Sequence, residues 1–242
     1  MTTFSSKFYT VLGAFAVFMM SVSTVGAHDV ASPAKKTINI GIYAQFSEKS
    51  AFIGRNILGA MEIAREQLAS SDIHYEFYTL DTLTNKANAS DTLQKFIDVN
   101  QINVLVTEGA DSDALIAPLA KKNGLIHFCM GNDAAIADGE NNFLAQSPNH
   151  QRAANLTTVM NPEFVAQFKQ DYSSYPVTEA GYAFDIFHLV HQSALIAMKT
   201  DSHFSSQAMA THLLALESGT GVMGAYSVGK KGVSYKKETL TA

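Results

Sequence analysis

The sequence predicts an α/β fold in which helices cover both faces of a parallel sheet. Strand-like segments with few polar residues alternate with amphipathic, helix-like segments along the first half of the chain. Strands of this kind are typical of a sheet that is buried on both faces. The chain has 242 residues, of which 47% are hydrophobic and 16% charged, so it can bury a substantial core. Repeated strand–helix alternation implies parallel strands joined by right-handed crossovers.

The elements of the first half follow from local hydrophobic patterns. The helix expected at residues 54–68 places Ile57, Met61 and Ala64 on one face, and a polar loop at 45–52 precedes it. A third helix starts near residues 111–113, because acids there and lysines at its other end complement the helix dipole. The expected strands are residues 37–44, 73–80, 102–107 and 125–130, and the second helix is 90–99.

After residue 131 the alternation stops. Turn-forming residues fill 131–151, apart from a short apolar segment at 143–145. Asn161-Pro162-Glu163 predicts a helix start, with a cap, a proline at the first position and an acid in the first turn. That helix is expected to bury Phe164, Val165, Phe168 and Tyr172. The later elements expected are a long buried helix at 178–198, a helix at 205–218 and short strands within 222–240.

The N-terminal segment has the pattern of a signal peptide at residues 1–27. Lys7 is the only charged residue there, and it precedes an apolar run over residues 8–25. Val25-Gly26-Ala27 supplies the small residues that a signal peptidase reads, so we expect the mature chain to begin at His28. The alternative is an uncleaved membrane anchor, since eighteen residues could just span a bilayer.

Composition and motifs argue against several functional classes. The net charge is −5 and no basic run occurs, so we expect no nucleic-acid partner. The single cysteine, Cys129, excludes an intramolecular disulfide and a Cys-rich zinc site. Residues 219–224 match the dinucleotide fingerprint Gly-x-Gly-x-x-Gly, but they follow a helix rather than a strand and no helix follows them. We therefore expect no cofactor.

Two histidine clusters are candidates for metal binding or catalysis. Asp185, His188 and His191 recur at three-residue spacing, so they could share a helix face. A metal there needs a further ligand, and polar contacts inside a packed helix are favoured instead. His127 and Cys129 lie on the same face of a strand, but a buried cysteine is the common case. We predict no catalytic residue, no metal site and no enzymatic activity.

The carboxyl ends of the predicted strands are the candidate binding region, because ligands of open parallel sheets lie there. These ends are residues 45–54, 81–85, 108–113 and 131–133. The segment 108–113 leads into a helix N-terminus, whose N–H groups point outward. The alternative is that Asp111, Ser112 and Asp113 only cap this helix.

Several segments, in this order and spacing, resemble the type I periplasmic binding proteins of ABC transporters. They are INIGIYAQFSEKSAFIGRNILGAMEIA, INVLVTEGADSDALIAPLAKKNGLIHFCM and NFLAQSPN, followed by EFVAQFKQDYSSYPVTEAGYAFDIFHLVHQSALIAM and VMGAYSVGKKG. The branch that binds leucine, isoleucine and valine, amides or urea is the most similar. The resemblance implies a periplasmic solute-binding component that takes amino acids or related amides and delivers them to a membrane permease.

The chain departs from this family in its middle. The family inserts most of a second lobe, roughly 100 residues, where only residues 150–161 occur here. We therefore expect residues 28–149 to form the first part of the N-terminal lobe. Residues 162–242 would supply helices that return to this lobe and a C-terminal β remnant of the second lobe.

The resemblance implies a set of ligand-binding residues in the first lobe. An aromatic contact falls at Ile53 beside Phe52, and a hydroxyl contact falls near Ala110, Asp111 and Ser112. Contacts after the fourth strand fall at Gly131 and Asp133. Acids replace hydroxyls twice, and two unit charges about 4 Å apart repel by roughly 4 kcal/mol at an effective dielectric of 20. An amine or amide therefore fits better than a free carboxylate.

The alternative function is that of a truncated, single-lobe exported protein that has lost ligand binding or serves in protein interaction. An exposed apolar patch around Phe143, Phe52 and Ile53 would favour that alternative. A homodimer is a third arrangement, in which a second chain would supply the missing wall of the site.

Overall fold

The computed structural model describes residues 35–68, 72–82, 88–108, 110–131, 133, 135–146 and 160–236, with the backbone alone for 110–114 and 146. The predicted signal peptide lies outside these residues, as does the connection over 150–159. Among the helices in the described ranges, none combines the length and the apolar character needed to cross a membrane.

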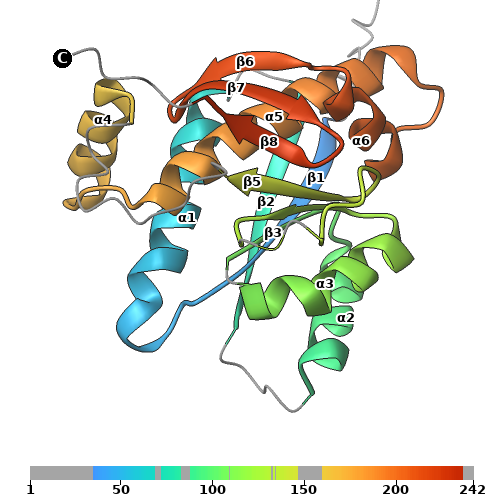
Figure 1. Cartoon of the computed structure of the whole chain (residues 1–242), viewed down its shortest axis with the longest axis horizontal. Helices are drawn as coiled ribbons and strands as arrows, with labels where there is room; N and C mark the ends of the chain where they lie inside the picture. Colours follow the sequence, from blue (N-terminus) through green and yellow to red (C-terminus); the bar gives the residue numbers. More distant parts are fainter. Residues whose placement is uncertain are drawn as a thin grey trace, which may run out of the picture. The chain divides into compact units, whose positions relative to one another are not determined.

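The described strands form a single sheet in the order β2-β1-β3-β4-β5-β8-β7-β6 (Figure 1). Neighbouring strands from β2 to β8 pair in parallel, whereas β7 pairs antiparallel with both β8 and β6. Their bounds are β1 Lys36–Ala44, β2 Ile73–Asp81, β3 Val104–Thr107, β4 Ile126–Cys129, β5 Asn142–Gln146, β6 Ser218–Gly221, β7 Gly224–Gly229 and β8 Gly232–Tyr235. The predicted α/β fold with a mostly parallel sheet is confirmed, and the C-terminal strands extend this same sheet.

Helices cover both faces of the sheet, as predicted. Along β1, the side chains of Ile38, Ile40 and Ile42 pack against α1, α5 and α6, while Tyr43 faces the opposite layer with α2 and α3. This division follows from the alternation of side chains along a strand. The helices are η1 Glu48–Ser50, α1 Ala51–Gln67, α2 Ala89–Asn100, α3 Ala110–Asn123, α4 Pro162–Tyr172, α5 Thr178–Thr200 and α6 Ser206–Leu214.

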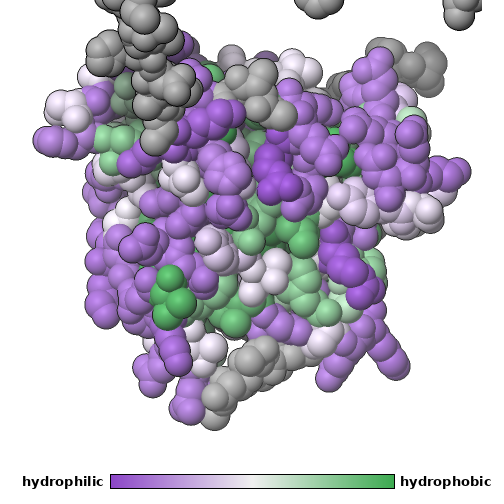
Figure 2. All heavy atoms as spheres, turned by 180° about the vertical axis from the view of Figure 1, so that it is seen from behind, coloured by the Kyte–Doolittle hydropathy of each residue, from purple (hydrophilic) through white to green (hydrophobic). Residues whose placement is uncertain are grey.

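The cap of α4 is confirmed by its hydrogen bonds. The Asn161 Oδ1 accepts from the backbone N–H groups of Glu163 and Phe164, at 2.8 and 3.2 Å. Helix α5 is buried along most of its length, as its apolar sequence indicates. Seen from behind, polar side chains border a band of apolar surface in the middle of that face (Figure 2).

Three expectations were wrong in detail. The loop expected at 45–52 contains η1 and the start of α1, because the backbone N–H of Gly54 donates to Gln45 O and closes the loop early. The helix expected at 205–218 ends at Leu214, and residues 218–221 form β6. A Cβ at Gly219 would overlap the Tyr226 ring, so a glycine there permits this hairpin. Tyr172 is 41% exposed rather than buried, because it lies over Gly59 at the rim of α1.

Candidate functional site

The carboxyl ends of four neighbouring strands lie side by side. The backbone N–H of Thr82, after β2, donates to Ala44 O at the end of β1 (3.0 Å). The N–H of Glu108, after β3, donates to Tyr43 O (3.1 Å), and that of Met130, after β4, donates to Thr107 O (3.0 Å). The four loops that follow these strands therefore start at one edge of the sheet, as the sequence predicts.

The first turn of α1, which follows the first loop, presents one aromatic side chain. Phe52 is 47% exposed, whereas its neighbour Ile53 is 9% exposed and belongs to the hydrophobic core. A Cβ on Gly54 would lie 2.5 Å from Gln45 O, so only glycine allows the loop to approach the helix this closely. Of the two residues predicted at this position, only Phe52 has a side chain available to a ligand.

The second loop leads directly into α3. The helix begins at Ala110, two residues after Glu108, so Ala110, Asp111 and Ser112 form its first turn. The structure describes the backbone of these three residues but not their side chains. Asp111 and Ser112 therefore occupy first-turn positions rather than the cap, where an acid interacts favourably with the helix dipole.

The third loop holds the remaining predicted residues. Gly131 is buried, and its N–H donates to the Cys129 Sγ at 3.3 Å. Asp133 is exposed, and its Oδ1 accepts from the backbone N–H of Ala135 at 2.9 Å. The Asp133 carboxylate thus stabilises its own turn while it remains accessible at the edge.

A hydrogen-bond chain through buried side chains connects β3, β4 and β5 and ends at the exposed Asp138. The two ring nitrogens of His127 bond to Thr107 Oγ1 and Asn142 Oδ1, both at 2.8 Å. The Asn142 amide donates in turn to Asp138 Oδ2 at 2.7 Å. Burial lowers the pKa of His127 to about 4, so the ring is neutral near pH 7. Both ring nitrogens of His127 are engaged in this chain, and Cys129 is buried, which is the common case that the sequence favoured.

Asp185 and His191 of α5 have separate partners. Asp185 accepts from the N–H groups of Val222 and Met223, at 2.7 and 3.1 Å, and His191 Nδ1 bonds to the Tyr75 hydroxyl at 2.8 Å. These are the polar contacts within a packed helix that the sequence favours. Within the part of the chain that the structure describes, no three His, Cys, Asp or Glu side chains are grouped to hold a metal ion.

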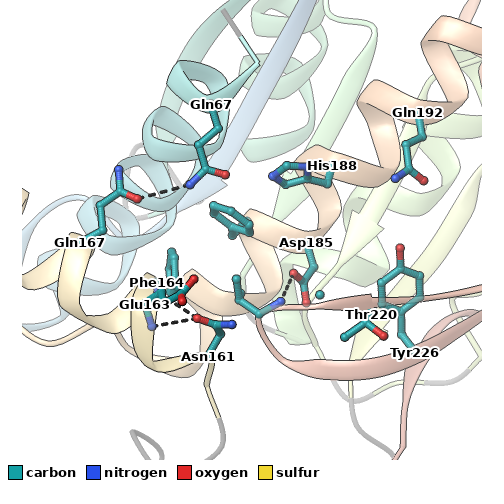
Figure 3. Close-up of a pocket in the computed structure, with 13 residues that line it drawn as sticks. Gln67, Asn161, Glu163, Phe164, Gln167, Asp185, His188, Gln192, Thr220 and Tyr226 are labelled. Carbon is teal, nitrogen blue, oxygen red and sulfur yellow. Dashed lines mark hydrogen bonds between the residues drawn. The ribbon is translucent and has the colours of Figure 1, made fainter.

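Sequence reasoning missed a pocket of about 410 Å³ away from the predicted residues (Figure 3). It lies between the end of α1, α4, α5 and the β6–β7 hairpin. The lining residues are Gln67, Asn161, Glu163, Phe164, Gln167, Phe184, Asp185, His188, Gln192, Thr220, Gly221, Val222 and Tyr226. They come from distant parts of the sequence, so local patterns could not predict the pocket. Only the three-residue spacing of Asp185 and His188 pointed to polar residues on one face of α5.

Comparisons with solved structures identify related folds. LivJ, a branched-chain amino acid transporter substrate-binding protein from Streptococcus pneumoniae solved with isoleucine, matches with a TM-score of 0.65 and 12% identity, over 83% of this chain and 94% of that chain. The leucine-binding protein LivK from Thermotoga maritima matches with 0.62 and 12%, over 81% and 92%. A solute-binding protein of an ABC transporter from R. palustris, solved with benzoate, matches with 0.66 and 11%, over 81% and 91%. No protein-family model and no curated protein matches the sequence.

Proposed function

We propose that this chain, which has the fold of the type I periplasmic binding proteins, is the solute-binding component of an ABC importer for amino acids or related amides. The fold is the observation that carries the proposal, because the matching structures are transporter solute-binding proteins rather than enzymes. Their ligands include isoleucine, leucine and benzoate. A membrane permease is the partner that this role implies.

The proposed ligand site is the carboxyl edge of the sheet. Phe52 offers an exposed apolar surface, and the N–H groups in the first turn of α3 offer hydrogen-bond donors. Asp133 adds an exposed carboxylate in the loop after β4, which favours an amine or amide group of the ligand over a free carboxylate. Ile53 contributes through its backbone, because its side chain packs in the core.

One lobe provides only one wall for this ligand. The described strands belong to a single sheet, and thirteen residues, 147–159, separate β5 from Met160. A well-formed pocket buries roughly 70–90% of its ligand, whereas an open edge leaves about half of it exposed. For the monomer we expect a dissociation constant in the millimolar range, which corresponds to a binding free energy of about −4 kcal/mol.

The interaction-module alternative depended on an exposed apolar patch. Of its three predicted members, Phe143 is fully buried and Ile53 is 9% exposed, so Phe52 alone remains at the surface. The structure therefore gives no reason to prefer that alternative at this edge. A homodimer would raise the affinity, because a second chain could supply the opposite wall.

Calorimetry of the mature chain with leucinamide and with leucine tests the proposal. We expect weak binding by a proven monomer, with leucinamide bound more tightly than leucine. Phe52→Ala should weaken binding, whereas Val99→Ala removes another exposed apolar side chain, on α2, and should not. Equal loss in both variants, or no heat with either ligand, would contradict the proposed site.

We also propose that the chain is exported to the periplasm after cleavage of residues 1–27. The supporting observations are the apolar run after Lys7 and the small residues Val25-Gly26-Ala27. N-terminal sequencing of the protein from a periplasmic extract should find His28 first. Membrane-bound material that begins at Met1 would refute this proposal.

A further inference from the structure

We propose that the pocket between α4, α5 and the β6–β7 hairpin binds a small organic cation that carries primary ammonium groups. This inference concerns a second site, and it does not depend on the amino-acid or amide site at the sheet edge. Its volume of about 410 Å³ falls within the range of small-molecule sites. The pocket shares no residue with the predicted edge site, since none of the residues predicted for that site lines it.

The charge of the lining selects for a cation. Glu163 and Asp185 contribute carboxyl groups, and no Lys or Arg occurs among the described residues that line the pocket. Burial, together with the nearby His191, lowers the pKa of His188, so this ring adds no positive charge near neutral pH. The two carboxyl groups would repel an anion, whereas an ammonium group would find partners of opposite charge.

The carboxylate of Asp185 is held in a fixed position. Its two oxygens accept hydrogen bonds from the N–H groups of Val222 and Met223, the two residues of the turn between β6 and β7. A Cβ at Gly221 would overlap this carboxylate, so only a glycine at this position allows the β6–β7 turn to approach Asp185 this closely. The acid is 2% exposed, and it acts on a ligand chiefly through its field in a region of low dielectric.

Aromatic rings and one buried ring nitrogen without a hydrogen-bond partner complete the environment. The rings of Phe164 and Phe184 lie 5.0 Å apart, and Tyr226 forms part of the lining from β7. Carboxylates together with aromatic faces are the surroundings in which ammonium ions bind favourably. The buried Nε2 of His188 has no hydrogen-bond partner among the described residues, and in the Nδ1–H tautomer it can accept from an ammonium N–H.

The rim of the pocket supplies neutral polar groups. Gln67 at the end of α1 donates to Gln167 on α4 at 3.3 Å, as the dashed line in Figure 3 shows. Gln192 and Thr220 are exposed on the other side. Amide and hydroxyl oxygens at both ends suit a short chain with an ammonium group at each end, which makes putrescine (1,4-diaminobutane) a suitable probe.

Three probes of equal length separate charge from shape. Putrescine is a dication, 1,4-butanediol is neutral and succinate is a dianion, and each has a four-carbon chain. In a titration of the ¹⁵N-labelled mature chain, putrescine should shift the amide signals of Val222 and Met223, because these groups donate to Asp185. Succinate should leave them unchanged. Equal shifts with succinate, or none with putrescine, would overturn the proposal.

Matched variants locate the site. Glu163→Gln removes one pocket charge and should weaken putrescine binding about threefold to fivefold, the effect of roughly 1 kcal/mol. Asp171→Asn removes a charge from the other end of the same helix, outside the lining, and should leave binding unchanged. Unfolding midpoints establish that both variants are folded. Equal loss of putrescine binding in the two variants would show that the cation is attracted only by the overall negative charge of the protein, and would refute the site.

The two proposed sites can fail independently. Phe52→Ala should leave putrescine binding intact, and Glu163→Gln should leave leucinamide binding intact. Putrescine shifts confined to Phe52 and Gly131 would place the cation at the sheet edge, and would overturn the second site while supporting the first.

Discussion

Replacing His127 with glutamine should remove much of the acid sensitivity of the fold. The ring is fully buried, and its two nitrogens bond to Thr107 and Asn142. Burial is the main cause that lowers its pKa from 6.5 to about 4. Between these values the unfolded chain binds a proton that the folded chain does not, so the free energy of unfolding falls as the pH falls.

The magnitude follows from the shift in pKa. A difference of about 2.5 units at about 1.4 kcal/mol per unit corresponds to about 3 kcal/mol, lost progressively between pH 6.5 and pH 4. Glutamine keeps one donor and one acceptor but cannot become charged in this range. His127→Gln should therefore be less stable by about 1–2 kcal/mol at pH 7.5, where one imperfect hydrogen bond is its main cost.

Urea unfolding of both proteins at pH 7.5, 6, 5 and 4 is the appropriate assay. The deficit of the variant should shrink as the pH falls and reverse its sign between about pH 6 and pH 5, where the loss in the wild type reaches about 1–2 kcal/mol. Carboxyl groups shared by the two proteins cancel in the difference, and His74→Gln provides a matched loss of an exposed imidazole. A constant difference between wild type and His127→Gln at every pH would refute the reasoning.

The remaining predictions concern a buried acid, a cap and a core ring. Burial raises the pKa of Asp185 from 3.8 to about 6, so the stability that this group contributes is present below pH 3.8 and is lost as the pH rises through 6. The free energy of unfolding of Asp185→Asn should therefore gain about 3 kcal/mol relative to wild type between pH 4 and pH 7.5. Urea midpoints of the two proteins that move in parallel with pH would contradict this. Asn161→Ala should cost about 1 kcal/mol through loss of the α4 cap, and an unchanged unfolding free energy would show that the cap is dispensable. Phe168→Ala should cost about 3–5 kcal/mol because this ring is fully buried, whereas a loss no larger than that of the half-exposed Tyr172→Ala would argue against the packing of α4.

Local patterns predicted the first half of the fold well. The apolar strands β1 to β4 and the amphipathic helices α1 to α3 lie within a few residues of their expected positions, because burial on two faces and on one face leave distinct periodicities. The pairing of β8 with β5 was not predictable in this way. It joins Leu144 to Gly232, almost 90 residues apart. It depends on a glycine at this position, where φ is +111° and the Cβ of any other residue would overlap the Leu144 backbone.

The candidate sites show the same division between local and distant information. The sheet-edge loops followed from the rule that ligands lie beyond the carboxyl ends of parallel strands, and the structure places these ends side by side. The burial of Ile53 could not be read locally, because it depends on where α1 begins. The hydrogen-bond chain through His127 and Asn142 required the β4–β5 register, and the second pocket required the packing of α4 on α5.

The central claim, that one lobe binds its ligand at the carboxyl edge of the sheet, is tested most directly by amide chemical shifts of the ¹⁵N-labelled mature chain during titration with leucinamide. The protein should be shown to be monomeric under the same conditions. We predict shifts at Phe52, Gly131 and Asp133 that saturate with a millimolar dissociation constant. Shifts elsewhere, or none at saturating ligand, would contradict the site, and micromolar affinity in a proven monomer would contradict the one-wall account of its energetics.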